Sequence, residues 1–556
     1  MNRFAELLDR LAYEPSRNNK LRLLTDYFRT QADPDRGYAL AAMTGALTFA
    51  HAKPALVRTL ISDRTDPALF AMSYDYVGDL SETVALLWPA PLQLATAAGS
   101  NQPPAPSLSD IVEQMRETTK SALPKQLALW LDALDETGRW ALLKLITGGL
   151  RIGVSARLAK TAVASMGGLD PNEVEEVWHG LRRPYLELFA WVEGREPRPI
   201  TDDPAPFRTP MLAHAIDDRD FASLDPAAFS AEWKWDGIRV QAVTGFAAAG
   251  ASVQRLYSRT GEDMSHSFPD MLEALGAAGL GSVAIDGELL VVREGLVQSF
   301  GVLQQRLNRK SVNAKLIADY PLHVRAYDLL MENGEDLRPL PFMERRARLE
   351  ALLARCDPAR LDLSPLVPFE AWEALAQARR DPASAGAGAD AEAIEGVMLK
   401  RRQSIYVPGR PRGPWWKWKR DPFNVDAVLM YAQRGHGKRS SFYSDFTFGV
   451  WREGTGGEEL APVGKAYFGF TDEELGLLDK WVRNNTVNRF GPVREVSHGG
   501  DDGLVLEIAF DGLNRSTRHK SGLAMRFPRI SRIRWDKPAR EADRLEALER
   551  LLPTDQ

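Results

Sequence analysis

The sequence predicts three domains of different class: an all-α domain, a mixed α/β domain and an all-β domain. Residues 1–205 carry apolar residues at helical spacing, as in 111–115 and 127–131, with no long alternating strand. Residues 206–421 mix alternating strands with helical segments, and residues 422–556 are rich in strands separated by glycine-rich turns. With 556 residues, 44% of them hydrophobic, the chain is long enough to bury several cores.

The first domain begins with a predicted amphipathic helix at residues 1–10, which lacks the apolar core of a signal peptide. The most apolar stretch, 38–52, is shorter than the roughly 20 residues that cross a membrane, so we expect a buried helix. The proline-dotted run 196–210 is the expected connection to the second domain. These features predict a cytoplasmic protein.

The second and third domains have strand and helix patterns of ordinary length. In the second domain we expect strands at 239–243, 283–292 and 322–330 and helices at 270–278 and 342–354. In the third we expect strands at 426–431, 446–451 and 504–510, and a C-terminal helix over 539–552, where leucines recur at helical spacing.

Cysteine content and charge distribution narrow the class of protein. The single cysteine, Cys356, excludes an internal disulfide and a cysteine-built zinc site, which suits a reducing compartment. Net charge is −5, yet 401–420 and 512–534 each hold seven Lys or Arg and no acid. A merely solvated face would mix both signs. These two segments therefore favour a nucleic-acid partner.

The segment 232–239 places Lys234 between Trp233 and Trp235, with Arg239 nearby. An amine that attacks phosphorus must be unprotonated, although a free lysine has a pKa near about 10.4. Neighbouring cations and apolar walls favour the neutral form, so Lys234 is a candidate nucleophile. Taken alone, the segment is equally typical of a strand that ends in a turn at Asp236.

Six further motifs follow Lys234 in order. The first motif is 234–239. The six that follow it are 258–263, 286–288, 327–330, 395–400, 416–419 and 526–537. The ordered set resembles the covalent nucleotidyltransferases, the superfamily of ATP-dependent DNA ligases, RNA ligases and mRNA capping enzymes. This resemblance implies that Lys234 attacks the α-phosphate of ATP, with Asp236 of the same motif among the catalytic residues.

The resemblance also implies which residues hold the phosphates and the metal. Lys417 and Lys419 are two residues apart in a predicted strand, which puts both ammonium groups on one face, where they clamp the α-phosphate. Arg526 and Lys537 bear on the β- and γ-phosphates. Glu395 is the implied ligand for Mg²⁺, or for Mn²⁺, because such cations prefer oxygen ligands.

The remaining motif residues are implied to bind the nucleoside. Glu232 faces the exocyclic amine of adenine, and Tyr327 stacks on the base. Glu288 accepts hydrogen bonds from the ribose and is a second candidate metal ligand. Arg239 contributes to nucleotide binding, and Arg259 reaches the sugar or the phosphate at the nick.

The segment 148–155 resembles a signature of the DNA-binding domain that precedes the catalytic core in larger ATP-dependent DNA ligases. Its glycines allow the backbone to approach a phosphate that Arg151 engages, and Lys144 and Arg157 extend that face. A glycine-rich helix junction is the alternative. In the third domain, Lys438 and Arg439 lie in an expected basic hairpin and are also candidate DNA contacts.

Segments 432–439, 464–470 and 516–522 resemble bacterial ATP-dependent DNA ligases of the three-domain ligase B type. The resemblance implies a helical DNA-binding domain, a nucleotidyltransferase (adenylation) domain and an OB fold. It also implies a monomer, associated with the nucleoid, that encircles duplex DNA. The implied activity joins a 3′-hydroxyl to a 5′-phosphate at a nick through a lysyl-AMP intermediate and a DNA-adenylate.

Two alternatives remain open at this point. An RNA ligase or a capping guanylyltransferase shares the lysine chemistry, although the segment 148–155 points to duplex DNA. A non-catalytic protein that clamps nicked DNA is the other class, and it would be marked by loss of Lys234 or Glu395, both of which are present.

Overall fold

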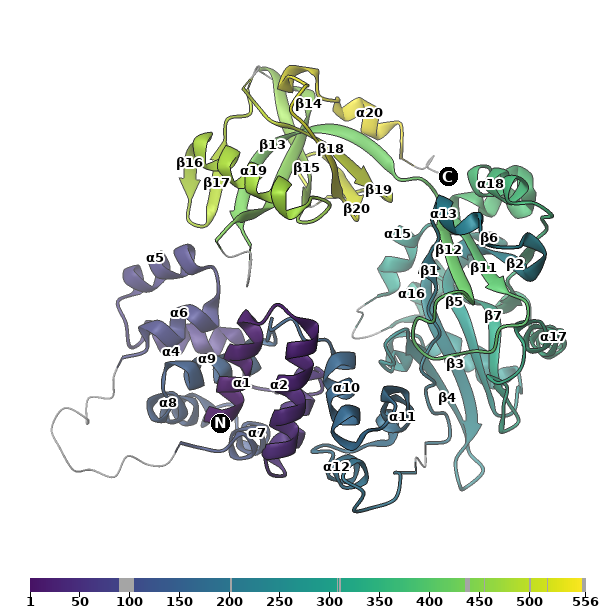
Figure 1. Cartoon of the computed structure of the whole chain (residues 1–556), viewed down its shortest axis with the longest axis horizontal. Helices are drawn as coiled ribbons and strands as arrows, with labels where there is room; N and C mark the ends of the chain where they lie inside the picture. The colour runs from purple at the N-terminus through teal and green to yellow at the C-terminus, as the bar shows by residue number, and fades with distance from the viewer. Residues whose placement is uncertain are drawn as a thin grey trace. The chain divides into compact units, whose positions relative to one another are not determined.

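The computed structural model describes residues 1–89, 105–200, 203–307, 309, 312–435, 441–454, 456–499, 502–517 and 519–552. The chain divides into two compact units (Figure 1). One contains Met1–Pro171, Arg182–Arg198 and Pro422–Gln556, and the other contains Asn172–Leu181 and Pro199–Asp421. Residues 1–198 form the helical region, residues 199–421 the α/β region and residues 422–552 the β region.

The helical region consists of short helices that begin at capping residues. Ser107 and Asp110 form a capping box at α7, and Ser155 caps α10. Gly148, with φ 76°, ends α9 because a left-handed residue closes the last turn without steric cost. The helices are α1 Asn2–Tyr13, α2 Arg17–Thr30, α3 Asp35–Met43, α4 Pro54–Ser62, α5 Pro67–Val77, α6 Leu80–Leu87, α7 Leu108–Glu117, α8 Leu123–Ala133, α9 Glu136–Thr147, α10 Ala156–Gly167, α11 Pro171–Val177 and α12 Leu186–Val192.

Two sheets form the α/β region. One has the strand order β1-β12-β11-β2-β10, and the other has the order β4-β3-β5-β7-β8, with β6 on β5 and β9 on β7. The strands are β1 His214–Ala215, β2 Phe229–Trp235, β3 Ile238–Phe246, β4 Ser252–Ser258, β5 Val283–Arg293, β6 Leu296–Val297, β7 Leu322–Glu332, β8 Glu335–Asp336, β9 Leu361–Leu363, β10 Leu366–Val367, β11 Ile394–Arg401 and β12 Trp415–Lys419. The helices are α13 Asp218–Phe221, α14 Pro269–Ala277, α15 Phe300–Leu303, α16 Ala314–Asp319, α17 Phe342–Leu353 and α18 Trp372–Arg380.

Each of these sheets buries one face under helices and turns the other toward its partner. A core of β3, β5 and β7 residues packs with Met271 of α14 and Leu349 of α17. A second core joins β2, β11 and β12 to Leu375 of α18. A third contains Leu330 of β7 and Trp415 of β12, so the two sheets also pack against each other. The polar residues on the facing sides are thereby held between two rigid layers.

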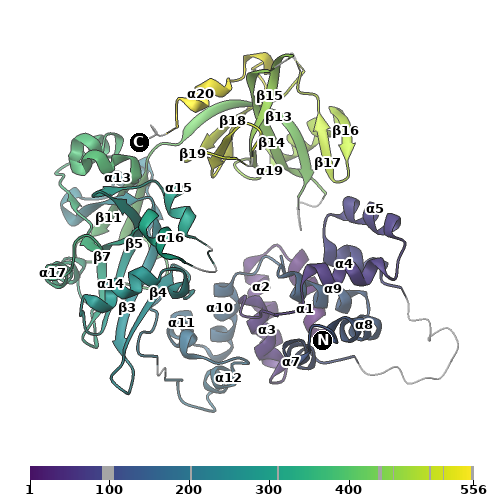
Figure 2. The same ribbon diagram turned by 180° about the vertical axis from the view of Figure 1, so that it is seen from behind.

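The β region has the strand order β15-β14-β13-β17-β16, and β18 pairs with both β13 and β21. The strands are β13 Phe423–Arg434, β14 Tyr443–Gly454, β15 Gly457–Ala466, β16 Thr486–Phe490, β17 Val493–Val496, β18 Val505–Phe510, β19 Gly512–Arg515, β20 Leu523–Arg526 and β21 Arg529–Arg534. Its longer helix, α19 Asp472–Asn484, starts with a capping box of Thr471 and Glu474 and buries Leu478 in the core. Figure 2 shows this region from behind.

The C-terminal segment is helical over a shorter range than the predicted 539–552. A 3₁₀ turn, η9 Ala539–Glu541, and the short helix α20 Leu545–Glu549 are separated by an extended link. In that link the amide of Asp543 donates to the carbonyl of Asp426 at 2.8 Å, and Arg544 bridges to Trp451 of β14. Pairing with β13 and β14 therefore interrupts the helix that the leucine spacing predicted.

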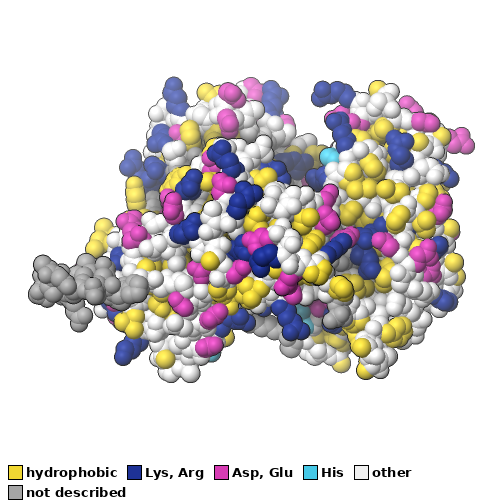
Figure 3. All heavy atoms as spheres, turned by 60° about the horizontal axis from the view of Figure 1, so that its bottom comes forward, with side chains coloured by type: hydrophobic (Ala, Val, Ile, Leu, Met, Phe, Trp, Pro, Cys, Tyr) yellow, Lys and Arg dark blue, Asp and Glu magenta, His cyan; other side chains and the backbone are white. Residues whose placement is uncertain are grey.

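The surface mixes both signs of charge. On the face drawn in Figure 3, Lys and Arg side chains of the described residues are interspersed with Asp and Glu. Arg529 pairs with Asp511 at 2.9 Å and Arg534 with Asp536 at 3.0 Å, so segments that are acid-free in sequence gain acidic neighbours in space. None of the helices in the described ranges has the length and apolar character that a membrane span requires.

Candidate active site

Strand alternation turns the predicted site residues onto the facing sides of the two sheets. Trp233, Val397 and Trp416 pack into the apolar core on one side of their sheet. Side chains that alternate with them point the other way. The face opposite this core carries Glu232 and Lys234 of β2, Met398 and Lys400 of β11, and Lys417 and Lys419 of β12.

The same alternation operates in the second sheet. Val240, Ile285 and Val324 point into the helix-covered core. The residues that point toward the first sheet are Arg239 of β3, Asp286 and Glu288 of β5 and Tyr327 of β7. Arg239 lies directly opposite Glu288 across the β3–β5 pair. The motifs that are far apart in sequence thus meet between the two sheets.

A bulge in β11 brings Glu395 into this group. The register between β11 and β2 shifts between Ile394 and Val397. Gly396 makes the bulge possible: its φ is 143°, and a Cβ there would lie 2.2 Å from the carbonyl oxygen of Trp418. The local irregularity therefore aims the carboxylate of Glu395 at the lysines of the neighbouring strands.

Glu395 joins two of the predicted lysines. The ammonium of Lys234 donates to Oε1 of Glu395, and the ammonium of Lys419 lies 3.2 Å from Oε2. Burial raises the pKa of Glu395, but the positive charges of Lys234 and Lys419 outweigh it and leave the pKa below its ordinary value. Glu395 is therefore ionised at neutral pH and holds both lysines in place.

Lys417 completes the positive side of the site. Burial, reinforced by the charges of Lys234 and Lys419, lowers its pKa, and Arg259 contributes to the same effect although it is solvent-exposed. Repulsion between Lys417 and the neighbouring cations would be reduced by a bound anion. The arrangement suits a phosphate group between β2 and β12.

Glu232 is buried and bound by two cations. Its side chain is 2% exposed, with Arg346 at 2.6 Å from Oε1 and Lys400 at 2.6 Å from Oε2. Arg346 was not among the site residues predicted from the sequence. The signal that could have found it is Arg345-Arg346 in the predicted helix 342–354, where both positions fall on the buried face.

Arg239 is held by a second buried group. It donates to Asp286 at 2.7 Å, to the carbonyl of Met211 at 2.7 Å and to the hydroxyl of Tyr406 at 3.1 Å. Tyr406 also donates to Asp286. Desolvation opposes the charge of Arg239, but Asp286 dominates and raises its pKa. Asp286 is therefore the residue that fixes this guanidinium.

Glu288 and Tyr327 lie next to Arg239. Desolvation raises the pKa of Glu288 to about 8, although Lys234 and Arg239 oppose this, and the Glu395 and Asp236 carboxylates add to the rise. Burial also raises the pKa of Tyr327 well above its ordinary value, so its phenol is neutral. A protonated carboxyl beside a neutral aromatic ring makes this side of the site less charged than the lysine side.

Asp236 anchors the turn that follows Lys234. Its amide donates to the carbonyl of Ala393 at 2.8 Å, which ties the β2–β3 turn to the start of β11. A Cβ on the next residue, Gly237, would lie 2.6 Å from the carbonyl oxygen of Leu289. The turn therefore needs glycine, and it sets the position of Lys234 relative to Glu395.

The predicted β- and γ-phosphate residues lie in the β region. Arg526 ends β20, and its guanidinium is 5.5 Å from the ring of Phe527. Lys537 follows β21 and pairs with Asp426 at 2.8 Å, where Arg534 also binds at 3.0 Å. The Lys537 ammonium is therefore paired with a carboxylate of the β region, Asp426.

The predicted DNA contacts lie in different environments. Arg151 has a positive φ of 49° and a side chain that is 57% exposed. Arg157 is also exposed, on the first turn of α10. Lys144, in contrast, is 3% exposed and pairs with Asp79 at 2.7 Å. Lys438 and Arg439 lie outside the described residues.

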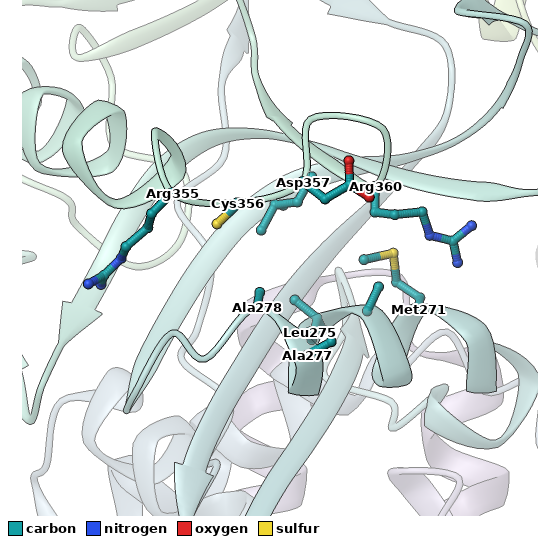
Figure 4. Close-up of a pocket in the computed structure, with 10 residues that line it drawn as sticks. Met271, Leu275, Ala277, Ala278, Arg355, Cys356, Asp357 and Arg360 are labelled. Atoms are coloured by element: carbon teal, nitrogen blue, oxygen red, sulfur yellow. The ribbon is translucent and has the colours of Figure 1, made fainter.

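A separate cavity of about 200 Å³ lies between α14 and the segment after α17 (Figure 4). Met271, Leu275 and Ala278 line one side, with Cys356 and Arg360 opposite. Burial raises the pKa of the Cys356 thiol, so the chain's one cysteine is a poor nucleophile at neutral pH. The cavity belongs to the packing of the domain, not to the lysine cluster.

Comparison with known families agrees with this geometry. Residues 210–419 match the family described as "ATP dependent DNA ligase domain", and residues 439–537 match "ATP dependent DNA ligase C terminal region". The first match contains Lys234, Glu395 and Lys419, and the second contains Arg526 and Lys537.

Individual relatives extend the similarity along the chain. A "Probable DNA ligase" of Koribacter versatilis (strain Ellin345) is 35% identical over 74% of this chain and 71% of its own length. "DNA ligase 1" of Korarchaeum cryptofilum (strain OPF8) is 29% identical over 98% of this chain and 97% of its own length. The solved structure "Pmar-Lig_PreS3" shares the fold over 96% of this chain and 99% of its own length, with a TM-score of 0.57 at 14% identity. The chain, with its lysine cluster between two sheets, therefore belongs to the ATP-dependent DNA ligases.

Proposed function

We propose that this ligase seals nicks with a 3′-hydroxyl and a 5′-phosphate in duplex DNA, through a lysyl-AMP intermediate and a DNA-adenylate. The observation that carries the proposal is the contact of Lys234 with Glu395, beside Lys417 and Lys419 on one strand face. A nucleophilic amine and two fixed cations in one place are what adenylyl transfer from ATP requires.

Each of the three steps exchanges one bond at phosphorus. Neutral Lys234 forms a bond to the α-phosphorus of ATP while the bond to pyrophosphate breaks. An oxygen of the 5′-phosphate then attacks the same phosphorus and releases Lys234. Finally the 3′-hydroxyl loses its proton, attacks the 5′-phosphorus and expels AMP. Lys234 is thereby regenerated for the next cycle.

The cations of the site offset charge that develops during these steps. Lys417 and Lys419 are placed to neutralise the non-bridging oxygens of the α-phosphate. Arg526 and Lys537 would serve the departing pyrophosphate. Arg259, which is solvent-exposed and whose charge helps to lower the pKa of Lys417, is proposed to reach the sugar or the nick phosphate.

Nucleoside recognition uses the less charged side. Glu232 keeps lone pairs available even with Arg346 and Lys400 bound, so it can accept a hydrogen bond from the adenine amine. Tyr327 offers a neutral ring for stacking. Glu288, with its pKa of about 8, carries a proton at neutral pH and can donate to a ribose oxygen as well as accept from one.

Of the two candidate metal ligands, Glu395 is the better fit. Its lowered pKa leaves an ionised carboxylate, the donor that Mg²⁺ prefers, whereas Glu288 would first have to lose its proton. No group of three His, Cys, Asp or Glu that could hold a metal occurs among the described residues, so waters and phosphate oxygens would complete the shell. A bound Mg²⁺ would supply positive charge to the phosphates.

The helical region is the proposed DNA-binding surface. Arg151 and Arg157 are exposed at the junction between α9 and α10, where Gly148 and Gly153 adopt positive φ values of 76° and 63°. Lys144 is left out of this surface because its ammonium is buried on Asp79. The protein is proposed to act as a monomer that encircles nicked DNA.

Incubation of the purified protein with α-labelled ATP and Mg²⁺ tests the proposal. We expect acid-labile label on the denatured chain, and none on Lys234→Ala. Lys125→Ala, which removes an exposed lysine of α8, should label like the parent. Added nicked duplex DNA should discharge the label as AMP while the nick closes. Unlabelled parent protein, after pyrophosphate treatment to remove bound adenylate, would overturn the proposal.

A further inference from the structure

The β region contains a cavity that only cationic and polar side chains line. Its volume is about 280 Å³. The lining residues are Arg434, Tyr443, Arg483, Thr486, Arg489 and Arg494, with no acidic side chain among them. A cavity lined by four arginines and by no acidic side chain is a candidate anion site.

Strand register and α19 bring the arginines together. Arg434, at the end of β13, lies opposite Tyr443 at the start of β14. Arg489 of β16 lies directly opposite Arg494 of β17. Three guanidinium groups surround the ring of buried Tyr443 at 5.4 Å for Arg483, 5.7 Å for Arg434 and 5.8 Å for Arg494. The Tyr443 ring therefore makes cation–π contacts with three of the four arginines.

Few of these charges are neutralised within the protein. Arg483 binds Asp479 at 2.7 Å. Arg494 donates to the carbonyls of Gly491 at 2.7 Å and Val493 at 3.1 Å, which satisfies hydrogen bonds but not charge.

The other three arginines have no ion-pair partner among the described residues. Glu495, next to Arg494 in sequence, is bound by Asn488 at 2.7 Å. In the described part of the chain, neither Arg434 nor Arg489 forms an ion pair. Like charges directly opposite on paired strands are destabilising. A bound anion would therefore reduce the repulsion between Arg489 and Arg494.

The cavity is separate from the predicted β- and γ-phosphate residues. Arg526 ends β20, which pairs with β19. Both views show the β19–β20 hairpin and the β16–β17 hairpin at opposite ends of the β region (Figures 1 and 2). A triphosphate that engages Arg526 therefore does not reach Arg489 and Arg494. A polyanion that extends past the nucleotide is the ligand that suits this second site.

We infer that this arginine cavity binds a phosphodiester of the DNA backbone away from the nick. The inference rests on the proposed nick-sealing function, because that function supplies duplex DNA as the ligand. Arginine suits the role since its planar fork can hold two phosphate oxygens at once. Such contacts position the duplex without reading its sequence.

Equilibrium binding of a nicked duplex that cannot be sealed, measured between about 50 and 200 mM salt, tests the inference. For Arg489→Gln we expect affinity to fall about tenfold at low salt, since hydrogen bonds to charged groups are strong. The slope of log K against log salt should decrease by about 0.9, the value for one lost phosphate contact. Arg489→Lys, which keeps the charge but loses the fork, should retain most of the slope and lose part of the affinity.

Lys480→Gln is the matched control. Lys480 is an exposed cation on α19, three positions before Arg483, and it does not line the cavity. Its loss should change affinity and slope less than Arg489→Gln does. Arg489→Gln should also melt at or above the parent temperature because it removes a like-charge pair.

Parent-like affinity and slope in Arg489→Gln would overturn the inference. So would a thermal shift from inorganic pyrophosphate that disappears in Arg489→Gln while DNA binding stays normal, because the site would then take a free anion. Failure of the proposed function is distinguishable. In that case Lys234→Ala would label like the parent, whatever the DNA affinity of Arg489→Gln.

Discussion

Among single residues, Glu395 is the group that holds two of the three site lysines, Lys234 and Lys419. It accepts from Lys234 and lies 3.2 Å from Lys419, and its lowered pKa keeps it negative. We expect Glu395→Gln to slow lysyl-AMP formation by about 100-fold or more, since it removes both this charge and the proposed metal ligand. Glu392→Gln, which changes an exposed carboxylate three residues earlier, should react at the parent rate. Near-parent adenylation by Glu395→Gln would contradict the role assigned to it.

Arg345 and Asp328 form a fully buried ion pair that stabilises the α/β region. Their two hydrogen bonds measure 2.7 and 2.9 Å, and both side chains are 0% exposed. Arg345→Met leaves Asp328 as an unpaired buried charge, so urea unfolding should show a loss of about 3–5 kcal/mol. Adding Asp328→Asn should recover part of that loss. A single variant within about 0.5 kcal/mol of the parent, the range of neutral surface changes, would refute this account.

At the scale of elements, Asp79 joins α6 to α9. It caps α6 through the amide of Glu82 at 3.1 Å and binds Lys144 of α9 at 2.7 Å. Burial raises the pKa of Asp79, but the hydrogen bonds from Lys144 and Glu82 prevail and lower it. A depressed carboxyl pKa stabilises the fold above the unfolded value of about 3.9, and this stability is lost as pH falls through the folded value.

We therefore expect Asp79→Asn to weaken amide-exchange protection in α6 and α9 at about pH 7, and its difference from the parent to shrink progressively as pH falls below about 3.9, the unfolded value. Asp9→Asn, at an exposed position of α1, should leave protection unchanged across this pH range. Equal effects of Asp79→Asn across this pH range would show that the carboxylate charge is not what joins the helices.

At the scale of the whole molecule, the proposed cycle needs residues from two regions. Lys537, held by Asp426 in the β region, is proposed to serve the pyrophosphate that leaves when Lys234 is adenylated in the α/β region. The chain passes between these regions at Asp421–Pro422, where the two compact units divide. A hinge there would let the β region serve adenylation and then release for DNA binding.

Lys537→Ala separates these stages. We expect it to slow self-adenylation by about 10- to 100-fold, as loss of an electrostatic contact to a developing charge does. Sealing of a nick that already carries AMP should stay close to the parent rate, because no pyrophosphate leaves in that step. Lys480→Ala serves as the control for both assays. Equal loss in the two assays would place Lys537 in DNA binding instead.

Sequence patterns were enough to predict the order of the motifs, the alternation that puts Lys417 and Lys419 on one face, and the helical, mixed or strand-rich character of each region. These depend on local spacing, because strand and helix periods repeat within a few residues. The contacts of Arg346 and Tyr406, the arginine cavity and the short helix within 539–552 were not predicted from the sequence.

Which charged side chains meet depends on how the strands and helices pack. Arg346 reaches Glu232 from a helix, and Asp79 takes Lys144 out of the expected DNA surface. Arg489 and Arg494 become neighbours because β16 and β17 fold back on each other. Electrostatic interaction depends on distance and burial, not on separation along the chain, so ion pairs and cavities exist only once the strands and helices have packed.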